Sequence, residues 1–349
     1  MGRTKIAVAL SGGVDSSAAA ALLVDQGYDV IGVTLRMRHP DPAFSERQTC
    51  GVKADIDAIE QVVSALNIRH FYLDRYPEFE DRVLRPAWNE YAAGRTPNPC
   101  CLCNPRIKFG ELIKFAVEHE AAALATGHYA RLVNGRLLRG IDRGKDQSYF
   151  LYGLTPAQLG FLRFPVGEMD KSEVKKYAAA LGLKLAAEKK ESQDACFSAD
   201  GECFAETLRR LFGVEMPEGE FRWNGRVVGC HSGVHRFTIG QRKKLNVALG
   251  VPAYVAHIDG ATGRVDLVTD EALLGRDTFE VNELNLQGDL PKRCMVQIRY
   301  RTPAAPGTVT RLSADRAAVR LDEPLRAVSP GQAAVFYDGD MLVGGGVIQ

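Results

Sequence analysis

The stretch "KIAVALSGGVDSSAAAALLVDQG", residues 5–27, carries the clearest signal of the fold. Its first part is mostly apolar and short, as in a buried strand, and the part after Asp15 has the pattern of a helix. A glycine-rich turn lies between the two. Such a turn points several backbone N–H groups in one direction, and the dipole of the following helix adds positive potential. The stretch therefore predicts a cradle for phosphate groups.

The residue types in this turn support an anion site. Gly12 and Gly13 let the backbone approach an anion without an intervening Cβ. Asp15 is a candidate Mg²⁺ ligand, because hard cations prefer carboxylate oxygen. Hydroxyl donors come from three serines: Ser11, Ser16 and Ser17. The turn matches neither G-x-x-x-x-G-K-[ST], since its lysine is missing, nor G-x-G-x-x-G. The alternative interpretation is a plain tight turn that starts a helix.

Further along, apolar runs at 29–35, 70–74 and 121–126 alternate with helical patterns such as 55–66. This alternation is typical of βαβ units and predicts an α/β fold with a doubly wound parallel sheet. Ligands of such sheets bind beyond the carboxyl ends of neighbouring strands. If the run 121–126 lies beside the first strand, "TGHYA" (126–130) emerges next to the phosphate loop.

Two residues at these strand ends are candidates for contact with a nucleoside. Gly127 would allow close approach of adenine or ribose, and Leu35 ends the second strand, where adenine could also rest. His128 is ambiguous, since a lone histidine at a strand end is more often structural than catalytic. Residues 129–140 have the pattern of a hairpin around Asn134-Gly135.

After about residue 205, helical patterns become rare and short alternating strands with glycine-rich turns take over. We therefore expect a catalytic domain at 1–205, followed by two small β-rich domains at 206–278 and 279–349.

Bulk composition indicates an ordinary globular chain of two or three domains. Its 349 residues are 46% hydrophobic and 25% charged, with a net charge of +1. No signal peptide and no stretch of membrane-spanning length is recognisable. Eight cysteines without an export signal favour a reducing, cytoplasmic environment. There, clustered cysteines are more often catalytic or metal-binding than paired in disulfides.

The distribution of charge is uneven although its sum is near zero. Residues 221–245 contain six Lys or Arg and no acid, and residues 290–312 contain five and no acid. Local positive fields of this kind attract nucleic-acid phosphates. The alternative interpretation is two solvated faces that acids elsewhere balance.

The segment "TPNPCCLCNP", residues 96–105, has a Cys100-x-x-Cys103 spacing typical of metal, cluster or redox pairs. Asn104 is a good N-cap and Pro105 suits a first helical position, so Cys103 is expected just before a helix N-terminus. Its thiol pKa should then be lowered, with Arg106 and Lys108 nearby. Cys196, in "KKESQDACFSAD", is a possible third member of the set.

The strand followed by S-G-G-V-D-S resembles the ATP pyrophosphatase (PP-loop) superfamily, which cleaves ATP to AMP and pyrophosphate and adenylates an oxygen of the substrate. Seven segments, in order, resemble bacterial tRNA-specific 2-thiouridylases, the MnmA family: "ALSGGVDSS", "GRTPNPCCLCNPRIKFG", "ATGHYA", "KDQSYFLYGL", "ESQDACF", "FTIGQRKKL" and "IRYR". The resemblance covers nearly the whole chain. It implies a PP-loop domain, of the adenine nucleotide alpha hydrolase-like fold, followed by two β-rich domains.

The resemblance implies that ATP adenylates the C2 oxygen of the wobble uridine of a tRNA, and that sulfur then displaces AMP. It assigns ATP binding to Ala9, Leu10, Ser11, Gly12, Gly13, Val14, Asp15, Ser16, Leu35 and Gly127. It assigns contact with the target base to Asn98, Pro99 and Cys100. It assigns tRNA contact to Lys145, Asp146, Gln147, Arg299 and Tyr300. Cys103 matches the nucleophile and Cys196 the persulfide carrier. The implied substrates are tRNAs that read Lys, Glu and Gln codons, and the sulfur donor is sulfide or a persulfide-carrying protein.

One departure from the family's pattern changes the expected sulfur chemistry. Many members have Asp where this chain has Cys100, which gives three thiols: Cys100, Cys103 and Cys196. Three cysteines can hold a [4Fe-4S] cluster with one open iron. A structural zinc is the plainer alternative, because zinc also takes cysteine ligands. A persulfide route without a cluster also stays open.

Two other classes of function share some of these signals. An amidating PP-loop ligase would use the same loop with an amine, but would leave the three cysteines idle. A non-catalytic RNA-binding or redox-sensing protein would have no use for an intact S-G-G-V-D-S.

Overall fold

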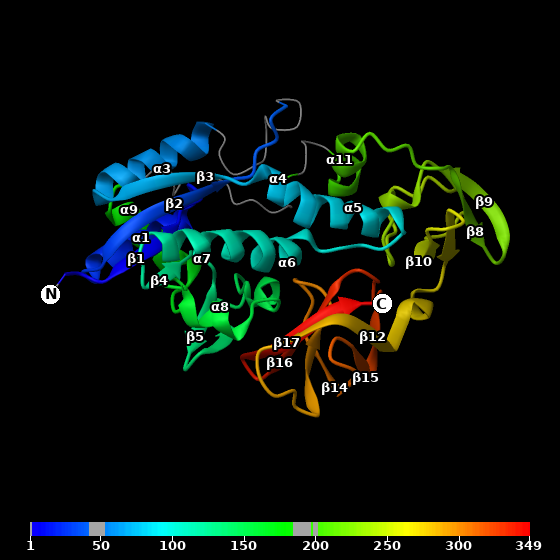
Figure 1. Ribbon diagram of the computed structural model, residues 1–349. Coiled ribbons are helices and arrows are strands. Elements are labelled where there is room, and N and C mark those ends of the chain that lie inside the picture. Colours follow the sequence, from blue (N-terminus) through cyan, green and yellow to red (C-terminus); the bar gives the residue numbers. More distant parts are fainter. Residues whose placement is uncertain (1, 42–52, 184–196, 198–201) are drawn as a thin grey trace. The chain divides into compact units, whose positions relative to one another are not determined.

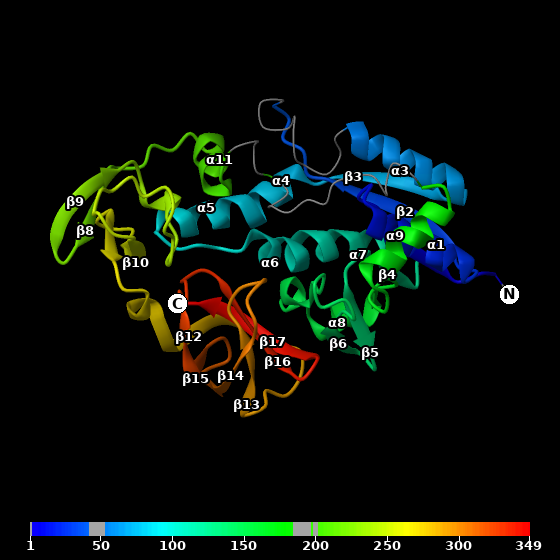
Figure 2. The same ribbon diagram turned by 180° about the vertical axis from the view of Figure 1, so that it is seen from behind.

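The computed structural model describes residues 2–41, 53–183, 197 and 202–349. The chain divides into two compact units (Figures 1 and 2). Unit 1 contains residues 1–83, 100–200 and 340–342, and unit 2 contains 84–99, 201–339 and 343–349. Buried apolar side chains form separate clusters in the two units. Within the described ranges, no helix is both long enough and apolar enough to cross a bilayer.

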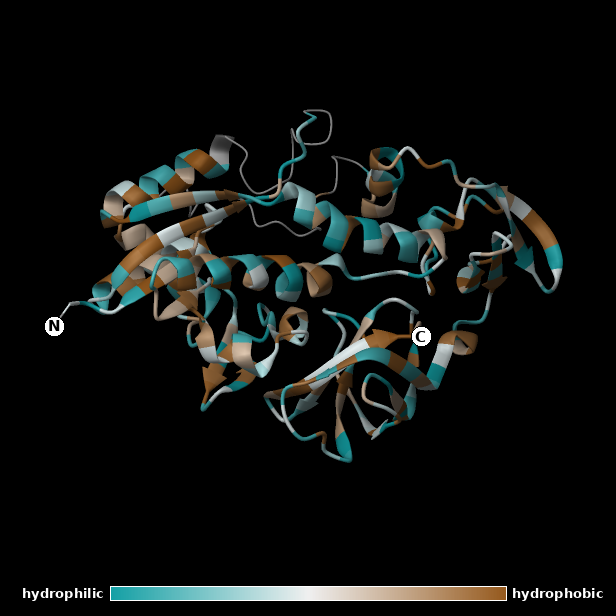
Figure 3. Cartoon of the chain, in the orientation of Figure 1, coloured by the Kyte–Doolittle hydropathy of each residue, from teal (hydrophilic) through white to brown (hydrophobic). Residues whose placement is uncertain are grey.

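Unit 1 is built on a five-stranded sheet with the order β3-β2-β1-β4-β7. Its strands are β1 (Lys5–Ala9), β2 (Asp29–Arg36), β3 (Arg69–Asp74), β4 (Ala123–Ala125) and β7 (Leu162–Arg163). All neighbouring pairs are parallel. The order reverses between β1 and β4, so the first and fourth strands are neighbours, which meets the condition under which residues 126–130 emerge next to the phosphate loop. Brown and white colours, for apolar and neutral residues, dominate β1 and β2 in Figure 3.

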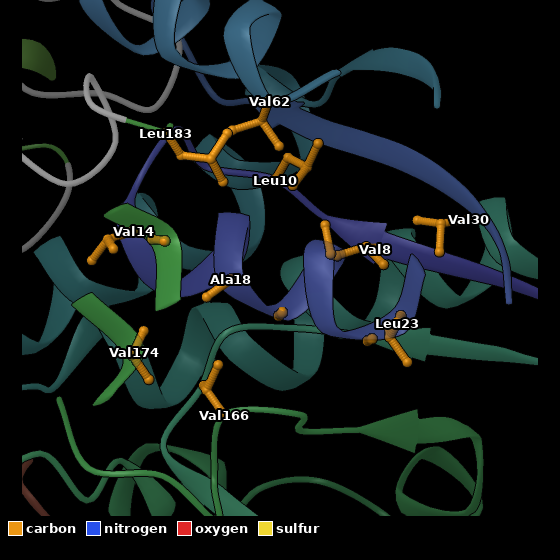
Figure 4. Close-up of a cluster of buried hydrophobic side chains, with 14 of the residues drawn as sticks. Val8, Leu10, Val14, Ala18, Leu23, Val30, Val62, Val166, Val174 and Leu183 are labelled. Carbon is orange, nitrogen blue, oxygen red and sulfur yellow. The ribbon is translucent and has the colours of Figure 1, made fainter. Parts of the chain in front are cut away.

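Unit 1 also contains helices. They are α1 (Val14–Asp25), α3 (Lys53–Leu66), α4 (Tyr76–Phe79), α6 (Pro99–Cys103), α7 (Phe109–Glu118), α8 (Pro156–Phe161) and α9 (Lys171–Ala180). Helix α1 packs on α9 and α3, whereas α7 packs on β1 and β4. Buried aliphatic side chains from the sheet, α1 and α9 form one cluster (Figure 4). The hairpin β5 (Ala130–Val133) and β6 (Arg136–Arg139) turns at Asn134 and Gly135, both with positive φ as a type I′ turn requires.

Unit 2 contains two helices, α5 (Arg85–Ala92) and α11 (Phe204–Leu211), and two β structures. One is a sheet of order β10-β11-β8-β9, formed by β8 (Gly219–Trp223), β9 (Arg226–His231), β10 (Tyr254–Asp259) and β11 (Arg264–Val268). The other is a barrel of β12 (Gly275–Leu286), β13 (Arg293–Gln297), β14 (Ala305–Arg311), β15 (Ala317–Arg326), β16 (Ala333–Asp338) and β17 (Met341–Ile348). Strand β12 pairs with both β15 and β17, which closes the barrel. The expected fold class, an α/β domain followed by small β-rich domains, is confirmed.

The helix after the cysteine segment differs from the prediction. Helical structure begins at Pro99, with α6, and continues through a π-helical turn at Asn104–Lys108 (η2) into α7. Asn104 is therefore not an N-cap, and Cys103 has helical dihedrals of −65° and −43°. Pro105 lacks an N–H and crowds the preceding turn, and a π-helical turn is one way in which a helix accommodates this. The helix N-terminus that was expected to lower the pKa of Cys103 is not there.

Candidate active site

The loop after β1 is held by its own serines. Ser16 Oγ donates to the carbonyl of Gly13 at 3.0 Å and accepts from the backbone N–H of Ser11 at 3.2 Å. Ser17 Oγ donates to the same carbonyl at 2.9 Å. Gly12 has a φ of +70°, and a Cβ there would meet the carbonyl oxygen of Asp55 at 2.8 Å. The loop therefore needs a glycine at this position for both conformation and space.

The N-terminus of α1 has no side-chain cap from the described residues, since its N-cap is Gly13. The first N–H groups of a helix have no intrahelical partner, and the helix dipole makes this end electropositive. α1 is 12 residues long. An uncapped end on such a helix, reached through a glycine turn, is a ready binding site for an anion such as a phosphate group.

Gly127 lies two residues after the end of β4 and against the start of α1. A Cβ at this position would lie 2.5 Å from the carbonyl carbon of Asp15 and 2.5 Å from the amide nitrogen of Ser16. This contact brings the loops after β1 and β4 together at the reversal of strand order. Leu10, Val14 and Leu35 are buried. Their side chains belong to the core, so only their backbone atoms are suited to touch a nucleotide.

Asp15 is held by two residues that the sequence did not indicate. Lys171 Nζ lies 2.7 Å from Oδ1 and 2.8 Å from Oδ2 of Asp15, and the Tyr129 hydroxyl donates to Oδ1 at 2.8 Å. The D-x-x-E capping box at Asp170 marks the start of α9 in the sequence and forms in the structure. Nothing local showed that Lys171, 156 positions after Asp15, would reach the loop.

His128 has a structural environment. Its Nδ1 lies 2.8 Å from Thr126 Oγ1, and its ring packs near those of Phe109 and Phe164. Burial, and then the charge of Lys108, lower the pKa of His128 to about 3. The imidazole is therefore neutral at physiological pH.

The cysteine segment places Cys100, Cys101 and Cys103 in α6. Cys100 is half-buried and Cys103 is buried. The two stand three positions apart in a helix, which puts them on the same side. Burial and the neighbouring Cys100 raise the pKa of the Cys101 thiol well above its usual range, so Cys101 is suited to packing rather than to chemistry.

Cys196 lies outside the described residues, so the structure does not place it. The next residue, Phe197, is described and is 3% exposed. Its ring centroid lies 6.0 Å from that of Phe79 and 6.3 Å from that of Tyr76. In the ranges that the structure describes, no three His, Cys, Asp or Glu side chains have metal-binding geometry. Cys196, which the expected cluster needs, lies outside those ranges.

Two of the residues in unit 1 that were expected to contact tRNA form hydrogen bonds within the protein. Asp146 accepts from the backbone of Gly140 at 3.0 Å and Ser148 at 3.1 Å, and from Arg139 Nη1 at 2.8 Å. Gln147 Oε1 accepts from the backbone N–H of Tyr129 at 3.1 Å. These side chains shape the loop that presents Lys145, which is half-buried.

In unit 2, Arg299 has an internal role as well. Its Nη2 lies 2.7 Å from Ser329 Oγ and 3.2 Å from the carbonyl oxygens of Ile239 and Ala327. Tyr300 follows it in a turn, Asn98 precedes α6, and Pro99 is the first residue of α6. Their proposed contacts with RNA stay predictions.

Some basic residues of the stretch 221–245 form ion pairs with carboxylates, and others are exposed. Arg222 pairs with Glu220 at 3.0 Å and Arg236 with Glu206 at 3.0 Å. Arg242, Lys243 and Lys244 are consecutive and exposed. No described carboxylate forms an ion pair with these three residues, which we call the basic loop. It is the part of the stretch best suited to attract phosphates.

Three protein-family models match the chain. Residues 4–200 match the tRNA methyl transferase HUP domain, 207–269 the tRNA methyl transferase PRC-barrel domain, and 276–348 the Aminomethyltransferase beta-barrel domain. Among solved structures, NMN synthetase from Francisella tularensis matches with a TM-score of 0.34 and 16% identity over 62% of this chain and 79% of that one. That likeness is too weak to carry a conclusion.

Curated relatives match at much higher identity, and the three described here carry the name tRNA-specific 2-thiouridylase MnmA. The protein from Syntrophotalea carbinolica is 44% identical, with 98% of each chain covered. The one from Paramagnetospirillum magneticum is 44% identical over 99% of this chain and 95% of its own. The one from Solibacter usitatus is 42% identical over 99% of both. With such identity over nearly its full length, the chain belongs to the MnmA family of tRNA-specific 2-thiouridylases.

Proposed function

We propose that this chain is an ATP-dependent tRNA 2-thiouridine synthase that acts on the wobble uridine. The observation that carries the proposal is the uncapped N-terminus of α1, reached through the glycine turn and lined by Asp15 and Gly127. Full-length similarity to proteins named as 2-thiouridylases supports it. Two of the matching family models are named for tRNA methyl transferases. A phosphate-binding loop together with Cys100 and Cys103 fits activation by ATP and sulfur transfer better than methyl transfer.

ATP would bind with its phosphates on the loop, residues 9–16, and with its nucleoside near Leu35 and Gly127. The backbone N–H groups at the start of α1 and the serine hydroxyls would hold the pyrophosphate part. Asp15 is the residue that would hold Mg²⁺ there. Its carboxylate lies in the first turn of α1, beside the glycine turn, and 30% of its side chain is exposed.

Adenylation makes the uridine carbonyl reactive. O2 of the base attacks the α-phosphorus of ATP, the bond from that phosphorus to the bridging oxygen breaks, and pyrophosphate leaves. The N3 proton passes to solvent. A loop that stabilises the developing charge on pyrophosphate favours this step. Sulfur then adds to C2, and the C2–O bond breaks, so that AMP carries the original oxygen away.

Sulfur delivery involves Cys100, Cys103 and Cys196 in the route that we propose first. The same-side placement of Cys100 and Cys103 in α6 fits thiolate ligation of a [4Fe-4S] cluster, for which Cys196 would be the third ligand. Such a cluster would supply an open iron site that binds sulfide.

The alternative route uses a persulfide on Cys196. Its outer sulfur attacks C2 and AMP leaves, and the Cys103 thiolate then attacks the inner sulfur to release 2-thiouridine. The product is a Cys103–Cys196 disulfide. An external dithiol must reduce it before the next turnover.

The substrate base would enter at the start of α6, near Asn98, Pro99 and Cys100, while other parts of the tRNA meet Lys145, Tyr300 and the basic loop. A base that must reach an enclosed site has to leave the anticodon stack, and enzymes that modify bases commonly flip them out. The anticodons expected from the family are those that read Lys, Glu and Gln codons.

The decisive experiment incubates the protein with ATP, Mg²⁺, a sulfur source and unmodified tRNA, and analyses the nucleosides by mass spectrometry. We expect 2-thiouridine at the wobble position, with AMP and pyrophosphate released only when tRNA is present. The Cys103→Ala variant should make no product, whereas an amidating enzyme would tolerate that change. Release of AMP with an aminated base, or no dependence on tRNA, would contradict the proposal.

The sulfur route has a separate test. Anaerobic reconstitution with iron and sulfide should give a coloured protein with about four irons per chain. The Cys100→Asp variant, which has the residue common in the family, should bind less iron. A colourless wild-type protein that thiolates tRNA from a persulfide donor, and then needs a dithiol to continue, would decide for the persulfide route.

A further inference from the structure

The phosphate loop contains no lysine between residues 9 and 17. In loops of the G-x-x-x-x-G-K-[ST] type, a lysine at the end of the loop reaches the outer phosphates of the nucleotide. Here a lysine reaches the loop from elsewhere in the fold. Lys171 is the first residue of α9, and its ammonium group contacts both carboxylate oxygens of Asp15.

The position of Lys171 is tightly determined. Only 11% of its side chain is exposed, and its backbone N–H donates to Asp142 Oδ2 at 3.1 Å. The capping box of Asp170 and Glu173 fixes the start of the helix. Lysine is almost never buried without a partner, because taking an ammonium group out of water is costly. The chain therefore uses several contacts to hold this cation beside the loop.

Helix packing brings the N-termini of α1 and α9 to the same end. Lys171 meets Asp15 near the starts of the two helices, and the Tyr177 hydroxyl donates to Asp25 near their other ends, so the helices run parallel. Between these two polar contacts, Ala18, Val174 and neighbouring aliphatic side chains are packed (Figure 4). Figures 1 and 2 show α9 beside α1 from both sides. The positive ends of two helix dipoles thus lie at the loop.

Asp15 cannot bind Mg²⁺ and Lys171 in this way at once. The ammonium group contacts both carboxylate oxygens, and the Tyr129 hydroxyl occupies one of them as well. A divalent cation at these oxygens would lie beside a like charge. When Mg²⁺ arrives with ATP, the ammonium group must move away from the carboxylate, and phosphate oxygens are the nearest anions that the ligand brings.

We propose that Lys171 is the phosphate-binding lysine of this site. Without nucleotide it is the counter-ion of Asp15. With Mg²⁺ and ATP bound, Asp15 turns to the metal while Tyr129 keeps hold of the carboxylate, and Lys171 contacts the pyrophosphate part of ATP. Lys171 then also stabilises the charge that develops on pyrophosphate as it leaves. This proposal rests on the proposed function, because it needs ATP at the loop.

The competing interpretation is that Lys171 only ties α9 to α1. The chain offers a matched control, because Tyr177 and Asp25 tie the same two helices without touching the loop. Lys171→Met removes the charge and keeps most of the length, Lys171→Arg keeps the charge, and Tyr177→Phe breaks only the remote tie. Thermal unfolding of all three reports structural loss separately from ligand binding.

The test is equilibrium binding of α,β-methylene-ATP, pyrophosphate and AMP, each with Mg²⁺, measured by calorimetry. One charge-assisted hydrogen bond corresponds to about 10- to 100-fold in affinity. Lys171→Met should therefore weaken binding of the ATP analogue and of pyrophosphate by about that factor, and leave AMP nearly unchanged. Lys171→Arg should recover most of the affinity, and Tyr177→Phe should bind all three as the wild type does.

Wild-type affinity for pyrophosphate in Lys171→Met would overturn the proposal, and so would an equal loss in Tyr177→Phe. If Lys171→Met does not fold, the neutral variant Lys171→Gln takes its place: a loss of pyrophosphate affinity larger than its loss of AMP affinity supports the role, and equal losses or no loss refute it. A wild-type protein that binds no ATP analogue at all would instead refute the proposed function.

Discussion

Substitution of Gly127 by alanine should damage the site through backbone crowding alone. The added Cβ would lie 2.5 Å from backbone atoms of Asp15 and Ser16, whereas ordinary contacts begin near 3.4 Å. The loop after β4 and the start of α1 must therefore separate by about 0.9 Å, and overpacking of this kind costs about 1–3 kcal/mol. Neither partner atom belongs to a flexible side chain, so relaxation is limited. The same displacement moves the N–H groups that would hold phosphate.

The assay is thermal unfolding together with binding of α,β-methylene-ATP. For a cooperative unit of 150–250 residues, a loss of about 2 kcal/mol lowers the midpoint by roughly 4–8 °C. Nucleotide affinity should fall as well. Gly160→Ala is the matched control, because nothing lies within 4 Å of its added Cβ, and its midpoint should not fall below that of the wild type, since alanine favours a helix more than glycine does. A Gly127→Ala protein with the wild-type midpoint and affinity would refute the steric reasoning.

Three further predictions concern single residues. Burial lowers the pKa of His128 to about 3, so as pH falls the imidazole is protonated in the unfolded chain before it is protonated in the folded protein. Urea unfolding should therefore show a loss of up to about 1.4 kcal/mol of stability per pH unit below roughly pH 6.5. His128→Asn should reduce that slope. Arg299→Ala should lower the unfolding midpoint, because three oxygens lose the Arg299 donor, although the carbonyl of Ala327 keeps another, from Ser329 Oγ. Arg299→Lys should be intermediate, and an unchanged midpoint would argue against the internal role. Lys243→Ala should weaken tRNA binding and reduce its salt dependence by about one counterion. Arg222 is already paired with Glu220, so Arg222→Ala should change neither. Equal effects of the two variants in filter-binding titrations would exclude the basic loop as the tRNA contact.

The local features of this chain were decided by the sequence alone. The strand, glycine turn and helix of residues 5–25, the hairpin at Asn134-Gly135 and the change to short strands after about residue 205 all follow from periodicity and turn chemistry between near neighbours. Such features form because each is favoured over a few residues, whatever packs against them later. The βαβ pattern predicted a parallel sheet, whereas the position of β4 beside β1 is shown only by the structure.

Contacts between distant residues were decided only by the tertiary structure. The lysine missing from the loop is supplied by α9, and the packing of two helices on one sheet brings it there. Asp146 and Arg299, which the motifs marked as tRNA contacts, also make internal hydrogen bonds. The cysteine segment begins its helix at Pro99 and passes Pro105 in a π-helical turn, against the local preference for an N-cap at Asn104. Side-chain partners far apart in the chain depend on which elements pack together, and short patterns of residue types do not contain that information.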